Sequence, residues 1–280
     1  MAHMTEAAFA ELRARPGFRP ACNAAASAAI GYFQGLEPPL QWITKDIGRS
    51  GICLTALILD MLGRLTVQTL TAASVESLIS SPGRVSQVVR RCQEMGAFVI
   101  DDGPGLWTRR PAHVGPAIRE MMRGRWIVDF GPALSLAPEV AGAFELRHDD
   151  AAFRTYFLHL ARVTGLLPGI FAHSKGSPID YFLEREAGML ILFELLGAQA
   201  PDRSRFLEEA RISRYALSQR YGVSRAHINK VLSESGHAEA SGDRVSFSRE
   251  LSDGLERHFS IIFQMNIGGA RAMLSRHGAA

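Results

Sequence analysis

The sequence feature that most constrains the fold is a weak internal repeat. A shift of about 140 residues, half of the chain, brings similar residues of the two halves into register. Gly96 then aligns with Gly236, and apolar helical runs at 52–62 and 189–196 stand at matching places, each ending at a glycine. The identities are few, so a chance alignment of helical stretches is the alternative. The matching order and spacing over both halves favour a duplication.

The repeat predicts a chain of two domains. Prolines and glycines between residues 131 and 150 break the helical periodicity, so we place the boundary near residue 145. The expected domains are residues 1–145 and 146–280, each with several helices, a short hairpin and a further helix. The expected fold class is therefore mainly α-helical with small β hairpins.

Composition limits the class of protein. With 47% hydrophobic residues the chain can bury a sizeable core, which excludes a mainly disordered protein. No apolar run reaches the roughly 18 residues that cross a bilayer, and the first residues lack the pattern of an export signal. We expect a soluble, cytoplasmic protein with no membrane partner. The formal net charge is only +3, so the placement of the charges must indicate the partner.

The sequence contains none of the motifs that we sought for catalysis, nucleotide binding or metal binding. The cysteines lack the spacing of metal or redox sites, so we expect buried, reduced thiols at Cys22, Cys53 and Cys92. A cluster that could be read as a metal site is formed by His148, Asp149 and Asp150. Acidic side chains at a helix start need no metal, because they complement the helix dipole. We expect no enzyme activity, no metal and no cofactor.

The most informative stretch is a pair of short helices between residues 211 and 234. Leu217 and Tyr221 lie on one face of a first helix, which ends at Gly222. Ser224 can cap a second helix that carries its own apolar stripe. Two helices joined by a short turn that contains glycine define helix-turn-helix geometry.

The polar face of this helix pair is basic and contains no acid between residues 211 and 230. Its basic residues are Arg211, Arg214, Arg220, Arg225 and Lys230. Base edges and phosphates need short polar or cationic side chains on the outward face of the second helix. These positions hold Ser224, Arg225, His227, Asn229 and Lys230. We expect double-stranded DNA as the partner, and the alternative is a face that is merely solvated.

A short hairpin follows the second helix. Gly236 stops the helical pattern, residues 240–243 form a turn, and the alternating residues 244–247 form a strand. Arg244 would lie near the tip, where a cation can reach the minor groove or the DNA backbone. The order of these elements, with Val-Ser-Arg at 223–225, resembles the winged helix-turn-helix domains of bacterial transcription regulators.

The first half carries a related stretch at residues 80–98. A Ser-Pro pair, a Val-Ser pair, two aliphatic residues, basic residues and a glycine resemble the recognition helix of the MarR family. The matching residues are Ser81, Pro82, Val85, Ser86, Val88, Val89, Arg91 and Gly96. The resemblance implies DNA contacts from Arg84, Ser86, Gln87, Arg90 and Arg91.

The hairpin expected after this helix departs from the family pattern. We expect strands at 98–100 and 106–110 around a turn at 101–105, with Arg109 as a DNA contact. Asp101 and Asp102 place acid where the family typically has a basic tip. We therefore expect the first unit to bind DNA more weakly than the second, or to serve mainly as a scaffold.

The resemblance also implies an overall arrangement. MarR-type regulators are dimers with one winged unit per subunit, so this chain resembles a covalently fused pseudo-dimer. The implied fold has tandem winged helix-turn-helix units on a shared helical layer, with recognition helices in major grooves about 34 Å apart. The expected oligomeric state is a monomeric pseudo-dimer or a homodimer.

Aromatic residues in the helical layer allow two interpretations. They are core residues, or some of them line a pocket for a small aromatic effector, as the resemblance to MarR-like regulators implies. The candidate pocket residues are Phe33, Trp42, Phe171 and Tyr181. Two alternatives to a transcription regulator also stay open. These are a plasmid-type replication initiator and a winged-helix protein-interaction module that does not bind DNA.

Overall fold

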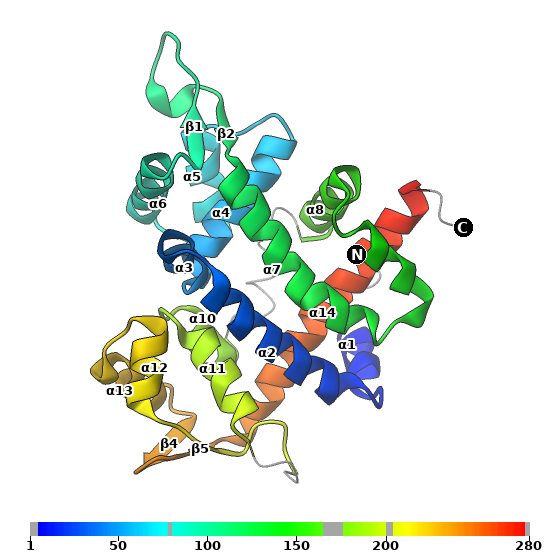
Figure 1. The fold of residues 1–280 in the computed structure, drawn as a ribbon, viewed down its shortest axis with the longest axis vertical. Helices are drawn as coiled ribbons and strands as arrows, with labels where there is room; N and C mark the ends of the chain where they lie inside the picture. The colour runs from blue at the N-terminus through cyan, green and yellow to red at the C-terminus, as the bar shows by residue number, and fades with distance from the viewer. Residues whose placement is uncertain (1–4, 78–79, 165–175, 200–203, 278–280) are drawn as a thin grey trace. The chain divides into compact units, whose positions relative to one another are not determined.

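A computed structural model describes residues 5–77, 80–164, 176–199 and 204–277 of the chain. Figure 1 shows a mainly helical protein with small antiparallel sheets, which confirms the expected fold class at this level. None of the helices within the described ranges combines the length and the apolar character that crossing a membrane requires.

The chain divides into two compact units, and each unit combines segments from both halves of the sequence. Unit 1 comprises Met1–Ile47, Val128–Pro138 and Ser174–Asn266. Unit 2 comprises Gly48–Ile127, Glu139–His173 and Ile267–Ala280. A boundary near residue 145 divides the chain differently, because residue 145 lies inside one segment of unit 2. The chain passes from one unit to the other inside two long helices, between residues 127 and 128 and between residues 266 and 267. Crossings inside helices have no proline- or glycine-rich linker that the sequence could reveal.

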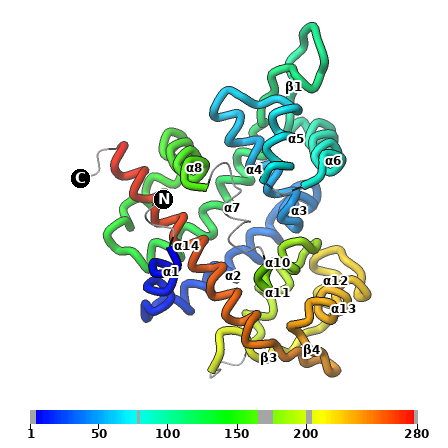
Figure 2. The backbone as a smooth tube through the Cα atoms, turned by 180° about the vertical axis from the view of Figure 1, so that it is seen from behind, coloured from blue at the N-terminus to red at the C-terminus, as the bar shows by residue number. Residues whose placement is uncertain are grey.

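The helices of unit 1 come before, between and after the strands of its sheet in the sequence. They are α1 (Glu6–Arg13), α2 (Phe18–Gly35), α3 (Pro38–Thr44), the end of α7 (Pro116–Leu134), α10 (Pro178–Leu183), α11 (Gly188–Gly197), α12 (Arg214–Tyr221), α13 (Arg225–Ser233) and the first part of α14 (Arg249–His277). Helix α2 packs along α11, as both views show (Figures 1 and 2). Phe263 joins this core, with ring centroids 6.0 Å from Phe18 and 5.8 Å from Phe259.

The sheet of unit 1 has three short antiparallel strands. These are β3 (Glu209–Arg211), β4 (Ala238–Ser241) and β5 (Arg244–Phe247), in the order β3-β5-β4. Val245 and Phe247 of β5 are buried, so this strand turns alternate side chains towards the core. The predicted strand at 244–247 is confirmed.

Unit 2 is built from helices around a two-stranded hairpin. Its elements are α4 (Ile47–Met61), α5 (Val67–Glu76), α6 (Pro82–Glu94), β1 (Phe98–Ile100), η1 (Trp107–Arg109), β2 (Ala112–Val114), the first part of α7 (Pro116–Leu134), η2 (Pro138–Leu146), α8 (Asp150–Thr164) and the end of α14. Trp126 of α7 packs on an aromatic group in α8. Its ring centroid lies 4.8 Å from Tyr156 and 5.9 Å from Phe153.

The second strand of the unit 2 hairpin does not lie where we expected it. Residues 106–110 form a 3-10 turn and its flanks, and the strand follows at Ala112–Val114. Burial explains the difference. Ala112 and Val114 alternate into the core opposite β1, whereas Leu106 and Trp107 are 64% and 49% exposed. The apolar residues Leu106 and Trp107 therefore do not mark a buried strand.

The order of elements recurs in the two halves of the chain. The sequence α3-α4-α5-α6-hairpin-α7 has its counterpart in α10-α11-α12-α13-hairpin-α14, with β3 added in the second half. Gly96 follows α6 with φ 65°, and Gly236 follows α13 with φ 70°. Both glycines occupy the left-handed region that favours glycine at helix ends.

Candidate nucleic-acid interface

The helix pair α12–α13 in unit 1 is fixed by local hydrogen bonds. Ser213 Oγ accepts from the backbone N–H of Ala216 at 3.2 Å and so caps α12. Gly222 ends α12 with φ 59°, a conformation that costs other residues about 1–2 kcal/mol. Ser224 Oγ then accepts from the backbone N–H of His227 at 3.0 Å and caps α13. The predicted turn at Gly222 and cap at Ser224 are confirmed.

Helix α13 has one buried and one exposed face. Its core side consists of Ile228, Val231 and Leu232, all of them buried. Ser224, Arg225, Asn229 and Lys230 are exposed. Arg225 and Asn229 are four residues apart, so they lie on the same side of the helix one turn from each other. The exposed face thus presents a cation and a carboxamide side by side.

Arg225 is the cation of this helix that is available for an external ligand. It is exposed, and within the described part of the chain no acidic side chain or carbonyl pairs with it. Lys230 Nζ lies 3.7 Å from Glu234 Oε1, a surface ion pair that contributes little to stability. A phosphate can therefore replace this partner at small cost. Arg225 lies at the start of α13, where the helix dipole also favours an anion.

Arg220, which we predicted as a DNA contact, is held inside unit 1. Its guanidinium pairs with Glu194 of α11, and Tyr221 donates a hydrogen bond of 2.8 Å to the same carboxylate oxygen. The bond to Glu194 raises the pKa of Arg220, and burial raises the pKa of Tyr221 well above its usual value. Arg220 and Glu194 therefore form a structural pair that fastens α12 to α11.

His227, also predicted as a DNA contact, faces the protein as well. Its Nε2 atom lies 2.9 Å from the carbonyl oxygen of Glu186, in the turn between α10 and α11. Lys45 binds the same turn, with Nζ 3.2 Å from Glu186 Oε1, and its carbonyl accepts from the N–H of Ala187. Ala187 has φ 58°, a strained value for a residue with a β-carbon. These contacts place the start of α13 relative to α11.

Two of the predicted cations, one on α12 and one on β5, lie at the hairpin that follows α13. The guanidinium of Arg214 donates to the carbonyl oxygen of Gly242, in the turn between β4 and β5. Arg244 Nη1 lies 3.7 Å from Glu209 Oε1 across the β5–β3 pair. Arg214 is therefore a support for the turn. Arg244 is half exposed and stays available at the hairpin tip.

Strand β3 and Tyr215 were not predicted. Strand β3 precedes α12 and pairs with β5, with Arg211 opposite Arg244. Ala210 in the strand and Ile212 directly after it are buried and alternate with exposed residues, which could have indicated a strand. Tyr215 is 63% exposed on α12 and offers a hydroxyl and a ring next to Arg214. An exposed aromatic residue beside a cation is the sequence feature that could have identified Tyr215 as a candidate contact.

Helix α6 of unit 2 presents a second polar face. Ser81 Oγ accepts from the backbone N–H of Arg84 at 3.4 Å, and Pro82 opens the helix, as predicted. The predicted stripe of Val85, Val88, Val89 and Cys92 is buried. Ser86, Gln87, Arg90 and Arg91 are exposed. Exposed cations and a carboxamide therefore occur on this helix too.

The predicted contacts on α6 differ in their availability. The Arg84 guanidinium lies against Gly48, where a β-carbon would stand 3.1 Å from its central carbon. Ser86 Oγ donates to the carbonyl of Pro82 at 3.1 Å, and Arg91 Nη1 lies 3.6 Å from Glu94 Oε2. Among the described residues, no acid pairs with Arg90. Arg90 thus corresponds to Arg225 as the open cation of its helix.

The hairpin of unit 2 is acidic and apolar at its end. Arg109 donates to Gln68 Oε1 at 3.1 Å, and Arg110 donates to the carbonyl of Gly105 at 3.2 Å. Both cations are therefore engaged by their own unit. The remaining exposed side chains include Asp102, Leu106 and Trp107. The exposed surface of this hairpin differs from that of the β4–β5 hairpin, which has an arginine at its tip.

The residues predicted to line an effector pocket are not all described. Phe33 is buried and packs on Tyr221, with ring centroids 5.4 Å apart. Tyr181 donates from its hydroxyl to the carbonyl of Lys230 at 3.2 Å, and Trp42 is half-buried. Phe171 lies outside the described residues. An effector pocket therefore stays a prediction.

The acidic residues at the start of α8 have structural partners. Asp149 Oδ1 accepts from the backbone N–H of Ala152 at 2.7 Å, and Asp150 pairs with Arg123. Over the described ranges, no three histidine, cysteine or acidic side chains group into a metal site. No family model, curated protein or solved structure matches this chain.

Proposed function

We propose that the protein is a sequence-specific, double-stranded DNA-binding transcription regulator with two winged helix-turn-helix units. Helix α13 would be the recognition helix of unit 1 and α6 that of unit 2. One observation carries the proposal. The capped pair α12–α13 holds Arg225 and Asn229 on its outer face, next to a hairpin with Arg244 at its tip.

The chemistry of this face fits a major groove. Arg225 can donate two parallel hydrogen bonds to a guanine edge or bind a phosphate, and Asn229 can pair with adenine. Lys230 and Arg244 supply cations to the phosphate backbone, which fixes the position of the protein on the duplex. Because His227 and Arg220 are engaged inside unit 1, they would position α13 instead of reading bases.

Unit 2 would contribute a second and weaker contact. Helix α6 offers Gln87, Arg90 and Arg91 on its exposed face. Its hairpin presents Asp102 and apolar side chains instead of a cation, and acid repels phosphate. Since the two helices differ, the binding site should be an imperfect palindrome with one stronger half.

The test is an anisotropy titration of the purified chain against its own upstream DNA and a scrambled duplex at two salt concentrations. Tighter binding of the upstream DNA that persists at the higher salt supports a sequence reader. Arg225→Ala should weaken it about tenfold or more. Arg154→Ala, which removes an exposed arginine of α8, is the matched control and should change little. Equal binding of both duplexes, or equal effects of both variants, would contradict the proposal.

A second candidate function concerns the hairpin of unit 2 alone. Leu106 and Trp107 are exposed there beside Asp102, a composition that suits contact with protein and not with phosphate. Trp107→Ala should then leave affinity for DNA unchanged. If Trp107→Ala weakens duplex binding as much as Arg225→Ala does, this hairpin faces DNA and the candidate fails.

A further inference from the structure

Two buried thiols meet in the core of unit 2. Cys53 of α4 and Cys92 of α6 are each 3% exposed, and both line the same cavity. The third cysteine, Cys22, is buried in unit 1. The expectation of buried, free thiols is confirmed for all three. The contact between two of them was not visible in their spacing, because it joins two helices far apart in the sequence.

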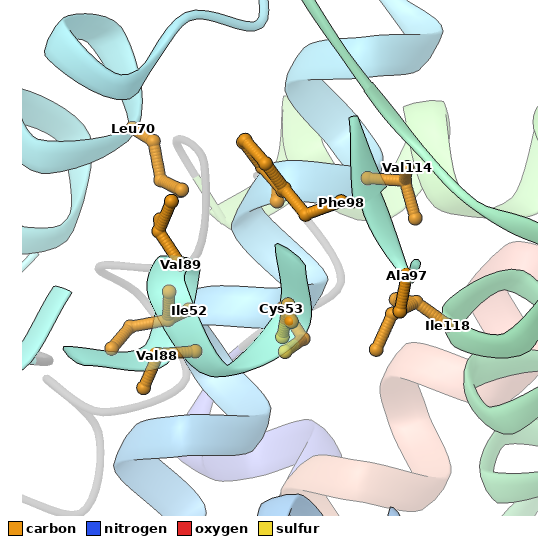
Figure 3. Close-up of a pocket in the computed structure, with 11 residues that line it drawn as sticks. Ile52, Cys53, Leu70, Val88, Val89, Ala97, Phe98, Val114 and Ile118 are labelled. Carbon is orange, nitrogen blue, oxygen red and sulfur yellow. The ribbon is translucent and has the colours of Figure 1, made fainter. Parts of the chain in front are cut away.

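The two thiols line a small apolar cavity. Figure 3 shows Cys53 among apolar side chains that include Ile52, Val88 and Phe98. The cavity has a volume of about 10 Å³, close to the space that one water molecule requires. The other side chains that line it are hydrocarbon, so the sulfur atoms are its reactive groups. A hydroperoxide such as hydrogen peroxide is only one oxygen atom larger than water.

The contact makes the two thiols chemically unequal. The hydrogen bond to Cys92, together with burial, raises the pKa of Cys53. The same hydrogen bond lowers the pKa of Cys92, because a donated S–H stabilises its thiolate. A thiolate is the nucleophile in oxidation and in disulfide formation. Cys92 is therefore suited to react first and Cys53 to follow.

We propose that Cys53 and Cys92 form a redox-active pair that a small hydroperoxide oxidises to a disulfide, and that this bond weakens DNA binding by unit 2. The Cys92 thiolate attacks one peroxide oxygen, the O–O bond breaks, and the departing hydroxide takes up a proton to become water. Cys53 then attacks the sulfur of the Cys92 sulfenic acid. The S–S bond forms, the S–O bond breaks, and the Cys53 proton leaves with the oxygen as a second water. Two thiols and one peroxide thus give one disulfide and two waters.

The link to DNA rests on the proposed function. A disulfide joins its sulfurs at about 2.05 Å, much closer than two hydrogen-bonded thiols. The proposal requires that closing this gap shifts α6 relative to α4. Cys92 directly follows Arg90 and Arg91 on α6, so the shift moves the cations assigned to DNA. A packed core transmits such a movement because it contains little space to absorb it.

The first arm of the experiment does not involve DNA. The purified full-length chain is treated with hydrogen peroxide, and its free thiols, intact mass and non-reducing peptide map are measured. We expect titratable thiols to fall from three to one, with a linked 53–92 peptide, reduced Cys22, and reversal by a dithiol. Three remaining thiols, or a linkage that involves Cys22, would overturn the pair. This arm needs no variant, so it holds even if a substituted chain fails to fold.

The second arm measures duplex affinity before and after oxidation. Oxidation should weaken binding about tenfold in the natural chain and in Cys22→Ala, and should have no effect in Cys53→Ala or Cys92→Ala. Circular dichroism confirms that each variant is folded. A disulfide that leaves affinity unchanged would overturn the regulatory step. If the reduced chain binds no DNA although the 53–92 linkage forms, the proposed function fails and the redox pair stands.

Discussion

His227 donates from Nε2 to the carbonyl oxygen of Glu186 across 2.9 Å, and this contact turns an apparent DNA-reading side chain towards the protein. The carbonyl can only accept, so Nε2 carries the proton. Lys45 binds the same residue through its side chain, so Glu186 joins the turn before α11 both to α13 and to the residue that follows α3. The orientation of α13 therefore depends on His227 and on the turn that contains Glu186.

Replacing His227 should lower both stability and affinity. His227→Ala removes one hydrogen bond and leaves the Glu186 carbonyl without this donor, which should cost about 1 kcal/mol of unfolding free energy. Asn229→Ala, on the exposed side of the same helix, should leave stability unchanged and weaken only DNA binding. Urea unfolding and duplex titration separate the two effects. Identical unfolding curves for His227→Ala and the natural chain would show that the contact is not structural.

Tyr221 should make the protein less stable in alkali. Its pKa in the folded chain lies above the ordinary value of 10.0, first because of burial and then because of its bond to Glu194. Above about pH 10 the unfolded chain releases this proton while the folded chain keeps it, so the free energy of unfolding falls as the pH rises. Tyr221→Phe lacks this group and should show a shallower fall. Parallel slopes for the two chains in urea titrations would rule out this role.

Two glycines should respond in opposite ways to alanine. Gly222→Ala places a β-carbon at φ 59° and should cost about 1–2 kcal/mol, although the nearest side-chain atom, Lys45 Nζ, is 3.9 Å away. Gly83→Ala, inside α6 with open space at its β-carbon position, should stabilise the chain by about 0.4–1 kcal/mol. Thermal unfolding of both variants checks the signs. A neutral Gly222→Ala would mean that the turn adapts.

Asp60 should be the acid on which the hairpin of unit 2 depends most. Its side chain is 6% exposed and accepts from the backbone N–H of Val114 and from Arg119, with His113 Nδ1 at 3.2 Å. Asp60→Ala leaves these donors without their acceptor and should cost about 2–3 kcal/mol. Asp102→Ala, at an exposed position, is the control and should be neutral. Equal stability of both variants would contradict this assignment.

Local patterns predicted the parts of the site that depend on local contacts. The apolar stripes of α6 and α13, the caps at Ser81 and Ser224, and the turn at Gly222 follow from contacts within a few residues. The sequence carries that information directly, because helix periodicity and capping act over one or two turns.

Partners from distant segments could not be predicted in this way. The stretch from 211 to 230 contains no acid, yet Glu194 of α11 pairs with Arg220. In the hairpin that follows, Glu209 of β3 pairs with Arg244. Among the described residues, no acidic side chain pairs with Arg211, Arg214 or Arg225, and Arg214 donates instead to the carbonyl oxygen of Gly242. Strand β2 lies further along the sequence than we predicted for a similar reason. Core packing, and not the local residue pattern, decides which segment pairs with β1.

The composition of the units has a consequence for how this chain could be divided. Met1–Ile47 packs with the helix pair of the second half, and Ile267–Ala280 belongs with the helix pair of the first half. Each half of the sequence therefore contributes its terminal segment to the unit that contains the helix pair of the other half. A domain-swapped dimer exchanges segments in the same way, but here both partners belong to one polypeptide. Neither half made alone would contain a complete unit. Two separately produced halves should instead recover the fold only when they are mixed.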